Sequence, residues 1–193
     1  IVYRATDRLT GDEVALKYIH FSSEECLSTA FTPTKADQSL KIALAKEFQM
    51  LTGLRHPNII SVLDYGFDDD QQPFFTMTYS AQAKTILQAG EHIDTAGKVG
   101  LLKQLLQAVA YLHRHGILHR NLKPENVMVV GQTVRVLDFG LSVNRQIIFG
   151  DQDEALLYMA PELLTLKEAS KASDLYAIGV IAYELFAGPL PFK

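Results

Sequence analysis

The sequence is poor in the features that mark secreted, membrane-spanning and nucleic-acid-binding proteins. Cys26 is the only cysteine among 193 residues, so no disulfide can form within the chain, as we expect in a reducing compartment such as the cytoplasm. The longest apolar stretch, residues 176–188, contains Glu184 and is too short to span a bilayer. With 18 basic and 22 acidic residues, the net charge of −4 provides no basic excess for nucleic-acid phosphates.

The sequence also shows no internal repeat, no low-complexity tract and no signal peptide. Hydrophobic residues make up 48% and charged residues 21% of the chain, an ordinary balance for a globular protein. A chain of 193 residues can form one domain with a substantial core, or two small lobes.

A β-hairpin is predicted at the start of the chain. Residues 1–5 and 13–19 are rich in β-branched and aromatic side chains, and residues 7–12 between them are turn formers. Lys17 lies inside the second strand. From the strand alone, Lys17 is interpreted either as an edge charge that keeps the sheet soluble or as a functional residue.

A helix is predicted after the irregular residues 21–37. Apolar side chains recur there at spacings of three and four and share one face, at Leu40, Leu44, Phe48, Leu51 and Leu54. Glu47 lies beside this face and, taken alone, is interpreted as a solvated helix charge. Pro57 ends the helix, because proline disfavours the helical conformation of the residue before it.

Two further strands are predicted over residues 59–63 and 74–79. The run of three acids at 68–70 lies between them. Three adjacent acids can form part of a metal site, but a solvated hairpin tip is the favoured interpretation.

A second, longer helix is predicted to begin at Asp94 or Thr95, either of which can cap it. Apolar residues form a broad stripe over 101–112, which indicates a helix buried on most sides. Residues 113–116 read His-Arg-His-Gly. Basic side chains are favourable at the C-terminus of a helix, where the helix dipole is negative, and glycine commonly ends a helix. His113 and His115 diverge on a helix, so they are not interpreted as a ligand pair.

A polar loop follows this helix. Residues 119–126 read His-Arg-Asn-Leu-Lys-Pro-Glu-Asn, and two short strands are predicted over 127–130 and 134–137, with a turn at Gly131-Gln132. The sequence Asp138-Phe139-Gly140 comes directly after the second strand.

Taken together, these stretches resemble the motifs of the eukaryotic-type (Hanks-type) serine/threonine protein kinase family, in the order in which that family has them. The resemblance extends over almost the whole chain. It rests on Val-Ala-Leu-Lys at 14–17, Glu47 nine residues before His56, the loop 119–126, Asp-Phe-Gly at 138–140, Ala-Pro-Glu at 160–162, and residues 174–179.

The resemblance implies an α+β, two-lobed protein kinase fold, with an N-terminal lobe over 1–79 and a C-terminal lobe over 80–193. It implies ATP and Mg²⁺ as cofactors and a protein substrate or regulatory partner. It assigns contacts with the nucleotide to Val2, Ala15, Lys17, Glu47, Met77, Tyr79 and Met128. It assigns Mg²⁺ binding to Asn126 and Asp138, and catalytic-loop roles to Asn121 and Lys123. His119, Phe139, Leu51 and Val62 are expected to be packing residues.

The sequence departs from the family at the position of the catalytic base, where Asn121 replaces aspartate. An asparagine side chain has a similar shape, but it cannot take the proton of a substrate hydroxyl. A positioned base contributes roughly 10²–10⁴ in rate. Kinases turn over at about 1–100 s⁻¹. Loss of the base would lower this turnover to roughly 10⁻⁴ to 1 s⁻¹, so we expect weak transfer. The alternative is a catalytically inactive pseudokinase that acts as a scaffold or switch.

Two further departures concern the segment before Ala160. Glu154 and Ala155 stand where serine/threonine members usually have Gly-Thr. Between Gly140 and Ala160 the only hydroxyl residues are Ser142 and Tyr158, so no central phosphorylation site is available to Arg120.

The ends of the chain are the last departure. The sequence begins past the place of the Gly-rich loop and ends before the family's last helices, so we expect it to belong to a larger chain. Glu162 is then expected to lack its usual arginine partner and to be a costly unpaired charge.

Overall fold

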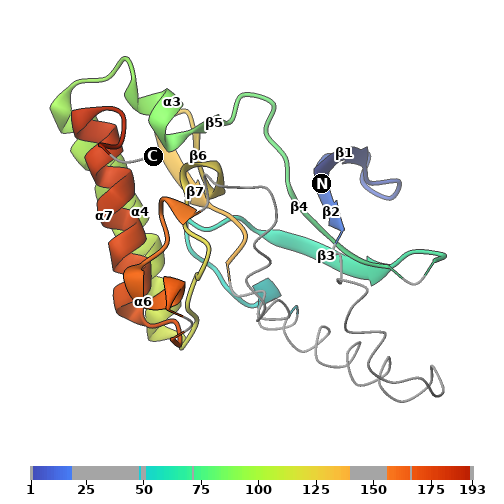
Figure 1. The fold of residues 1–193 in the computed structure, drawn as a ribbon. Coiled ribbons are helices and arrows are strands. Elements are labelled where there is room, and N and C mark those ends of the chain that lie inside the picture. Colours follow the sequence, from blue (N-terminus) through green and yellow to red (C-terminus); the bar gives the residue numbers. More distant parts are fainter. Residues whose placement is uncertain are drawn as a thin grey trace. The chain divides into compact units, whose positions relative to one another are not determined.

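The structure is a computed structural model that describes residues 2–18, 48, 51–70, 72–139, 156–165 and 167–191. These residues divide into two compact units (Figure 1). The first contains the described residues up to 55 and those of 61–79, and the second contains 56–60 and the described residues from 80 onward. The lobe boundaries 1–79 and 80–193 stay a prediction.

The first unit is built on a four-stranded antiparallel sheet with the order β1-β2-β4-β3. Its strands are β1 (Val2–Thr6), β2 (Glu13–Tyr18), β3 (Val62–Phe67) and β4 (Pro73–Thr78). The predicted hairpin at the start of the chain is therefore present. Its turn is fixed by Asp7, whose carboxylate accepts a hydrogen bond from the Leu9 amide at 2.8 Å, and by Gly11, whose φ of 78° is unfavourable for other residues.

The core of the first unit is aromatic. The Phe48 ring is buried, with its centroid 5.6 Å from that of Phe75 and 5.1 Å from that of Tyr65. Leu51 and Leu54 are buried as well. These three positions of the predicted apolar helical face are thus core residues, while Leu40, Leu44 and Glu47 lie outside the described residues.

The second unit contains a three-stranded antiparallel sheet with the order β5-β6-β7. Its strands are β5 (Lys84–Thr85), β6 (Val127–Val130) and β7 (Thr133–Val136). Ile59 adds a parallel bridge to Val136. The predicted strand over 59–63 is therefore wrong in its first half, because hydrogen bonds between the backbones of residues 58–60 and Val136 hold that half in the second unit.

The described residues of the second unit also form five helical segments: α3 (Ile86–Gly90), α4 (Thr95–Arg114), η1 (Pro124–Asn126), α6 (Pro161–Leu164) and α7 (Lys171–Ala187). The N-cap of α4 is Asp94, which accepts a hydrogen bond from the Gly97 amide at 2.8 Å, as the sequence predicts. The helix α4 packs against α7 (Figure 1). Side chains from both are fully buried, including Leu105, Leu112 and Ile181.

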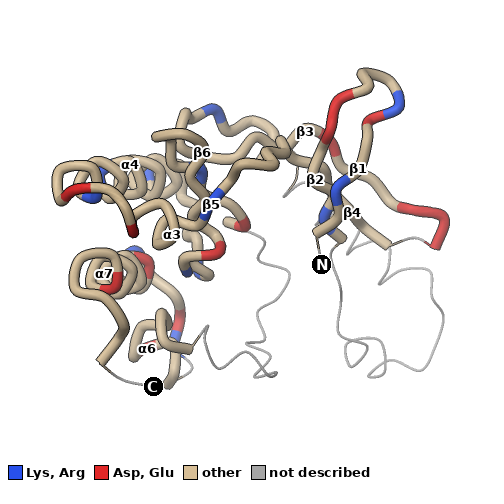
Figure 2. The backbone as a smooth tube through the Cα atoms, turned by 90° about the horizontal axis from the view of Figure 1, so that it is seen from above, with Lys and Arg blue, Asp and Glu red and all other residues tan. Residues whose placement is uncertain are grey.

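The acidic run 68–70 forms the turn between β3 and β4 (Figure 2). The Asp68 carboxylate accepts a hydrogen bond from the Gln72 amide at 2.8 Å, which closes the turn.

In the part of the chain that the structure describes, no helix combines the length and the hydropathy that a membrane span requires.

Candidate active site

The polar loop after α4 is held by one buried carboxylate. Asp174, in the first turn of α7, is 2% exposed. Its Oδ2 accepts a hydrogen bond from the amide of His119, and its Oδ1 accepts one from the amide of Arg120, both at 2.9 Å. These bonds fix the loop to α7, which lies 54 residues further along the chain.

The backbone at Arg120 is strained. Its φ is 66°, in the left-handed region that an arginine rarely adopts. Such a conformation costs of the order of 1–3 kcal/mol and persists only where surrounding contacts enforce it. Here the Asp174 carboxylate enforces it, and the strain determines where Asn121, the next residue, is placed.

The next hydrogen bonds fix the loop internally. The Asn121 amide donates to Nδ1 of His119 at 3.3 Å, and the Asn121 carbonyl accepts a hydrogen bond from Nδ2 of Asn126 at 2.7 Å. The loop thereby holds the backbone of residue 121 on both sides. Asn121 is exposed. Together with Leu122, Tyr158 and Met159, it lines a small pocket of about 40 Å³.

His119 contributes packing. Its ring is buried and lies edge-on to Phe139, at a centroid distance of 6.3 Å. Burial lowers the pKa of His119, against the opposing effect of the Asp174 carboxylate. The burial of His119, Phe139, Leu51 and Val62 agrees with the packing roles expected of them.

The predicted metal ligands are Asn126 and Asp138, and a backbone hydrogen bond connects the segments that carry them. Asn126 ends η1, and its carbonyl accepts a hydrogen bond from the amide of Leu137 at 2.9 Å, the residue before Asp138. Asp138 has a φ of 58°, a second strained position, two residues after the end of β7. Because Nδ2 of Asn126 is used by Asn121, its Oδ1 is the side-chain atom left for a cation.

This donor set fits Mg²⁺. An amide oxygen and a carboxylate are hard oxygen ligands, and Mg²⁺ in proteins is commonly held by one or two carboxylates together with phosphate and water. Lys123 lies between these residues and Asn121 as the N-cap of η1, and its side chain is half-buried. The second unit therefore brings Asn121, Lys123, Asn126 and Asp138 into one loop system.

The first unit holds four of the predicted nucleotide contacts on one face of its sheet. Val2 is directly opposite Lys17, and Ala15 is directly opposite Met77. Side chains of directly paired residues, and of residues two apart on one strand, share a face. Val2, Ala15, Lys17 and Met77 therefore lie on the same face, where Ala15 and Met77 are buried and Lys17 is half-buried.

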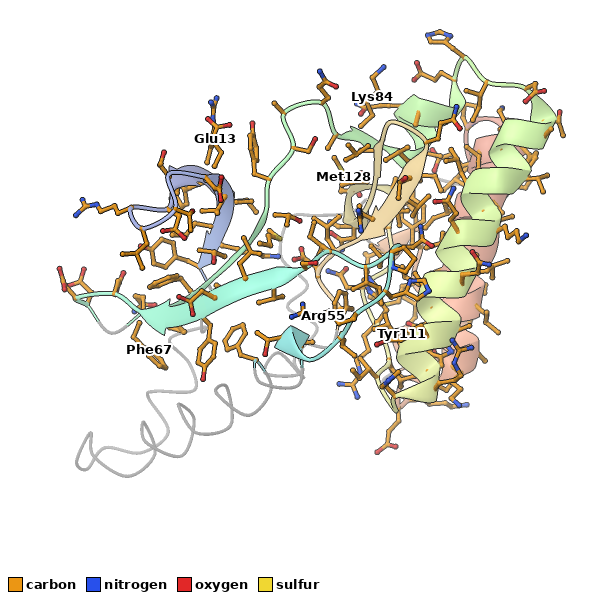
Figure 3. The ribbon with its side chains drawn as sticks, turned by 180° about the vertical axis from the view of Figure 1, so that it is seen from behind. Glu13, Arg55, Phe67, Lys84, Tyr111 and Met128 are labelled. Carbon is orange, nitrogen blue, oxygen red and sulfur yellow. The ribbon has the colours of Figure 1, made fainter. Side chains whose placement is uncertain are left out.

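The other predicted nucleotide contacts are Tyr79, Met128 and Glu47. Tyr79 directly follows β4, and its ring lies 5.6 Å from the guanidinium of Arg4. Met128 is half-buried on β6 of the second unit, paired with Thr85 of β5; Figure 3 shows it near Lys84. Glu47 lies outside the described residues.

Two hydrogen bonds fix the segment 156–162 to α7. The Tyr158 hydroxyl donates to Glu184 at 2.6 Å, and the Ser173 hydroxyl donates to Glu162 at 2.7 Å. The expectation that Glu162 is an unpaired buried charge is therefore wrong. Its carboxylate is half-exposed and has Ser173 as a partner, so no uncompensated buried charge arises.

The Ser173 hydroxyl lowers the pKa of Glu162 below its ordinary value of 4.5. Since the folded pKa is the lower one, the associated stability is fully present above pH 4.5 and is lost as the pH falls through the folded pKa. In a Ser173→Ala variant, we expect Glu162 to titrate closer to 4.5 in an NMR titration. An unchanged titration of Glu162 would show that the hydroxyl is not the cause.

The sequence analysis did not identify three residues that organise the site: Asp174 as the anchor of the loop, Ser173 and Glu184. Each lies on α7 and acts on a segment that precedes it in the chain. The periodicity of α7 indicates a buried helix but does not show what its polar residues contact.

The protein kinase domain pattern matches residues 1–193, the whole chain. The chain is 33% identical to the serine/threonine-protein kinase TIO of Arabidopsis thaliana over 99% of its length, which is 14% of that protein. It is 34% identical to a probable myosin light chain kinase of Dictyostelium discoideum over its full length, 59% of that protein.

The fold and the loop therefore define a protein kinase domain, and the chain belongs to the protein kinase family. Within that family it is of the Hanks-type serine/threonine class. PrkC of Bacillus subtilis, a serine/threonine-protein kinase, is 28% identical to it over 99% of the chain and 29% of PrkC. The chain spans less than two thirds of each of these relatives.

Proposed function

We propose that this domain binds Mg²⁺ and ATP and transfers the γ-phosphate to serine or threonine hydroxyls of proteins, at a rate lowered by Asn121. Family membership supports the use of ATP and Mg²⁺ and a protein substrate. The roles of the individual residues, and the low rate, are part of the proposal.

The observation that carries the proposal is the enforced backbone geometry at two positions, one in the loop 119–126 and one shortly after β7. Two non-glycine residues, Arg120 and Asp138, have φ values of 66° and 58°. Strain of this kind is found where a site is held ready for a ligand. A chain that made no contact with nucleotide and metal would gain nothing from a backbone held at this cost.

In this proposal, Lys17 binds the α- and β-phosphates, and Asn126 and Asp138 hold Mg²⁺. Bound Mg²⁺ neutralises the charge on the phosphates. Lys123 binds the transferred phosphoryl group and stabilises its charge. Ala15, Met77 and Tyr79 of the first unit, and Met128 of the second, each contribute a contact with the nucleotide.

The catalytic loop as described can orient a hydroxyl group but cannot take its proton. The side-chain oxygen Oδ1 of Asn121 can accept a hydrogen bond from a substrate hydroxyl, so orientation survives. Without a base, the proton has to leave to solvent or to a phosphate oxygen. We therefore propose turnover of roughly 10⁻⁴ to 1 s⁻¹, from the rates of kinases and the usual contribution of a base.

The same asparagine supports a second candidate, a pseudokinase. In that case, binding of ATP stabilises one conformation of the domain and a partner protein recognises it, with no transfer. The two candidates share nucleotide binding and differ in transfer.

We also propose a cytoplasmic location, on the basis of the single cysteine.

Nucleotide binding is tested first, by thermal unfolding of the intact protein. We expect Mg-ATP at a hundred times its Kd to stabilise the domain by about 2.7 kcal/mol. Lys17→Ala and Asp138→Ala are expected to remove most of this effect. Lys103→Ala, an exposed lysine of α4, is the matched control and should keep it. No shift of Tm by millimolar Mg-ATP in the unaltered protein would contradict both candidates.

A further inference from the structure

A groove of about 360 Å³, which we call the α4 groove, lies between α4 and the segment 56–58. Ligand sites in proteins usually have about 300–1,000 Å³. The described residues that line it all belong to the second unit: His56, Pro57, Asn58, Gln107, Ala110 and Arg114. None of these residues is acidic, and none has been assigned to the nucleotide, the metal or the catalytic loop. The α4 groove is therefore a candidate site of its own.

The backbone carbonyls of the segment 56–58 each already accept a hydrogen bond within the protein. Those of His56 and Asn58 accept from backbone amides, at 3.1 and 2.9 Å. The carbonyl of Pro57 accepts from the guanidinium of Arg135. The partial negative charges on this side of the α4 groove are thus largely compensated, which favours an anionic ligand over a cationic one.

Two side chains of the α4 groove provide hydrogen-bond donors. Nδ1 of His56 accepts a hydrogen bond from the Asn58 amide at 3.1 Å, so the neutral imidazole carries its hydrogen on Nε2. Burial first, and the positive charge of Arg114 second, lower the pKa of His56, which keeps this imidazole neutral at pH 7. Arg114 is exposed, and the residues that the structure describes form no salt bridge with it. The groove therefore combines a guanidinium with a neutral N–H group.

This combination suits a carboxylate on a peptide. A carboxylate carries one negative charge, which the guanidinium of Arg114 can neutralise through two parallel hydrogen bonds. A phosphate monoester carries nearly two charges at pH 7, more than the one charged lining residue neutralises. The Asn58 side chain uses its Nδ2 on Gln104 and Val134, which leaves its Oδ1 as a neutral acceptor. An acceptor of this kind suits the backbone N–H of a peptide and not a phosphate oxygen.

The residues of α4 indicate how long the peptide segment is. Gln107, Ala110 and Arg114 are three and four positions apart, so they share one face of the helix. From Gln107 to Arg114 the helix rises by about 10 Å, which corresponds to about three residues of an extended peptide. The α4 groove therefore fits a short extended segment rather than a folded surface.

We propose that the α4 groove binds a short acidic segment of a partner protein, with an aspartate or glutamate carboxylate of that segment on the guanidinium of Arg114. The Nε2–H of His56 donates a second hydrogen bond to the segment. The side-chain oxygens of Asn58 and Gln107 accept hydrogen bonds from its backbone. Binding in this groove does not depend on phosphoryl transfer, because none of its lining residues takes part in the proposed reaction.

The first test is an NMR titration of the intact protein with a peptide of three aspartates flanked by glycine and serine. We expect the backbone amide signals of Asn58, Gln107, Ala110 and Arg114 to shift with increasing peptide. The same peptide with asparagine in place of aspartate should cause no shift, and inorganic phosphate should bind more weakly than the aspartate peptide. No shift at these amides with millimolar aspartate peptide, or phosphate binding as tight as that of the peptide, would overturn the proposal.

The second test changes the charge of the groove. Arg114→Gln is expected to weaken binding of the aspartate peptide roughly tenfold or more, because it removes a charge-assisted pair of hydrogen bonds. Lys171→Gln removes the same charge from an exposed position of α7 outside the groove, and should bind like the unaltered protein. Arg114→Glu should reverse the preference and bind a peptide of three lysines instead. An unchanged Tm shows that each variant is folded.

Two results of the second test would contradict an acidic ligand. One is equal affinity of Arg114→Gln and Lys171→Gln for the aspartate peptide, which would show that the peptide responds only to the overall charge of the protein. The other is binding of the aspartate peptide by Arg114→Glu as tight as by the unaltered protein.

Discussion

Replacing Asn121 by aspartate is expected to raise the rate of phosphoryl transfer by roughly 10²–10⁴. The loop already fixes the backbone of residue 121 through His119 on one side and Asn126 on the other. An aspartate side chain has nearly the same shape as asparagine, so the substitution adds a proton acceptor without rebuilding the loop. The measurement is transfer of the γ-phosphate of ATP to a generic protein substrate by the intact protein.

The same experiment needs a variant that removes nucleotide handling. Lys17→Ala, added to Asn121→Asp, should abolish the gained activity, which excludes a contaminating kinase. Asn121→Ala tests whether the asparagine still orients the hydroxyl, and it should fall below the unaltered protein. If Asn121→Asp is as inactive as the unaltered protein, the absence of the base is not what limits transfer. The pseudokinase candidate is then favoured, and the substitutions at Glu154 and Ala155 become the first cause to test.

The elements of the fold were predicted well where one local pattern decides the structure. The helix α4 has a broad apolar stripe and a capping aspartate, and the structure begins it directly after Asp94. The first hairpin has two β-branched runs and a turn. The short helix α3 was not predicted, because its five residues are too few to show a period. The available signal was its capping box, in which Thr85 and Gln88 bond each other's backbone amides.

The strand predicted over 59–63 shows the opposite limit. Its apolar residues are typical of a strand, but they form parts of two different units. Asn58 determines this, because its side chain donates to Gln104 of α4 and to the carbonyl of Val134. A hydrogen bond between residues 46 positions apart leaves no periodic signal in the sequence. Hydrophobic patterning predicts elements, whereas polar contacts of this kind decide which element belongs to which unit.

The residues of the candidate site also form two groups, those that short motifs predict and those that only the packing reveals. Lys17, Asn121, Asn126 and Asp138 stand in short motifs and could be proposed from their order along the chain. His113, Ser173 and Glu184 lie in helices whose patterns only indicate burial. Their partners are 61, 11 and 26 residues away. The sequence therefore predicts which groups perform the chemistry, but the groups that hold them in place emerge only from the packing of α4, α7 and the segment before Ala160.

Removing the Asp174 side chain is expected to give the largest loss of stability of any single change among the residues that hold the loop 119–126. Asp174→Ala leaves the buried amide of His119, the amide of Arg120 and the ring of His113 without their common acceptor. Breaking a buried, hydrogen-bonded charged group typically costs about 3–5 kcal/mol. We expect a decrease of that size in the free energy of unfolding, measured by urea denaturation of the intact protein at neutral pH.

A neighbouring change on the same helix separates this effect from loss of helix stability. Lys171→Ala replaces an exposed residue in the first turn of α7, and we expect it to change the free energy of unfolding by no more than about 0.5 kcal/mol. Asp174→Asn should still be costly, because its amide nitrogen would face a donor in place of an acceptor. If Asp174→Ala costs no more than Lys171→Ala, the carboxylate does not hold the loop. The strained φ at Arg120 would then need another cause.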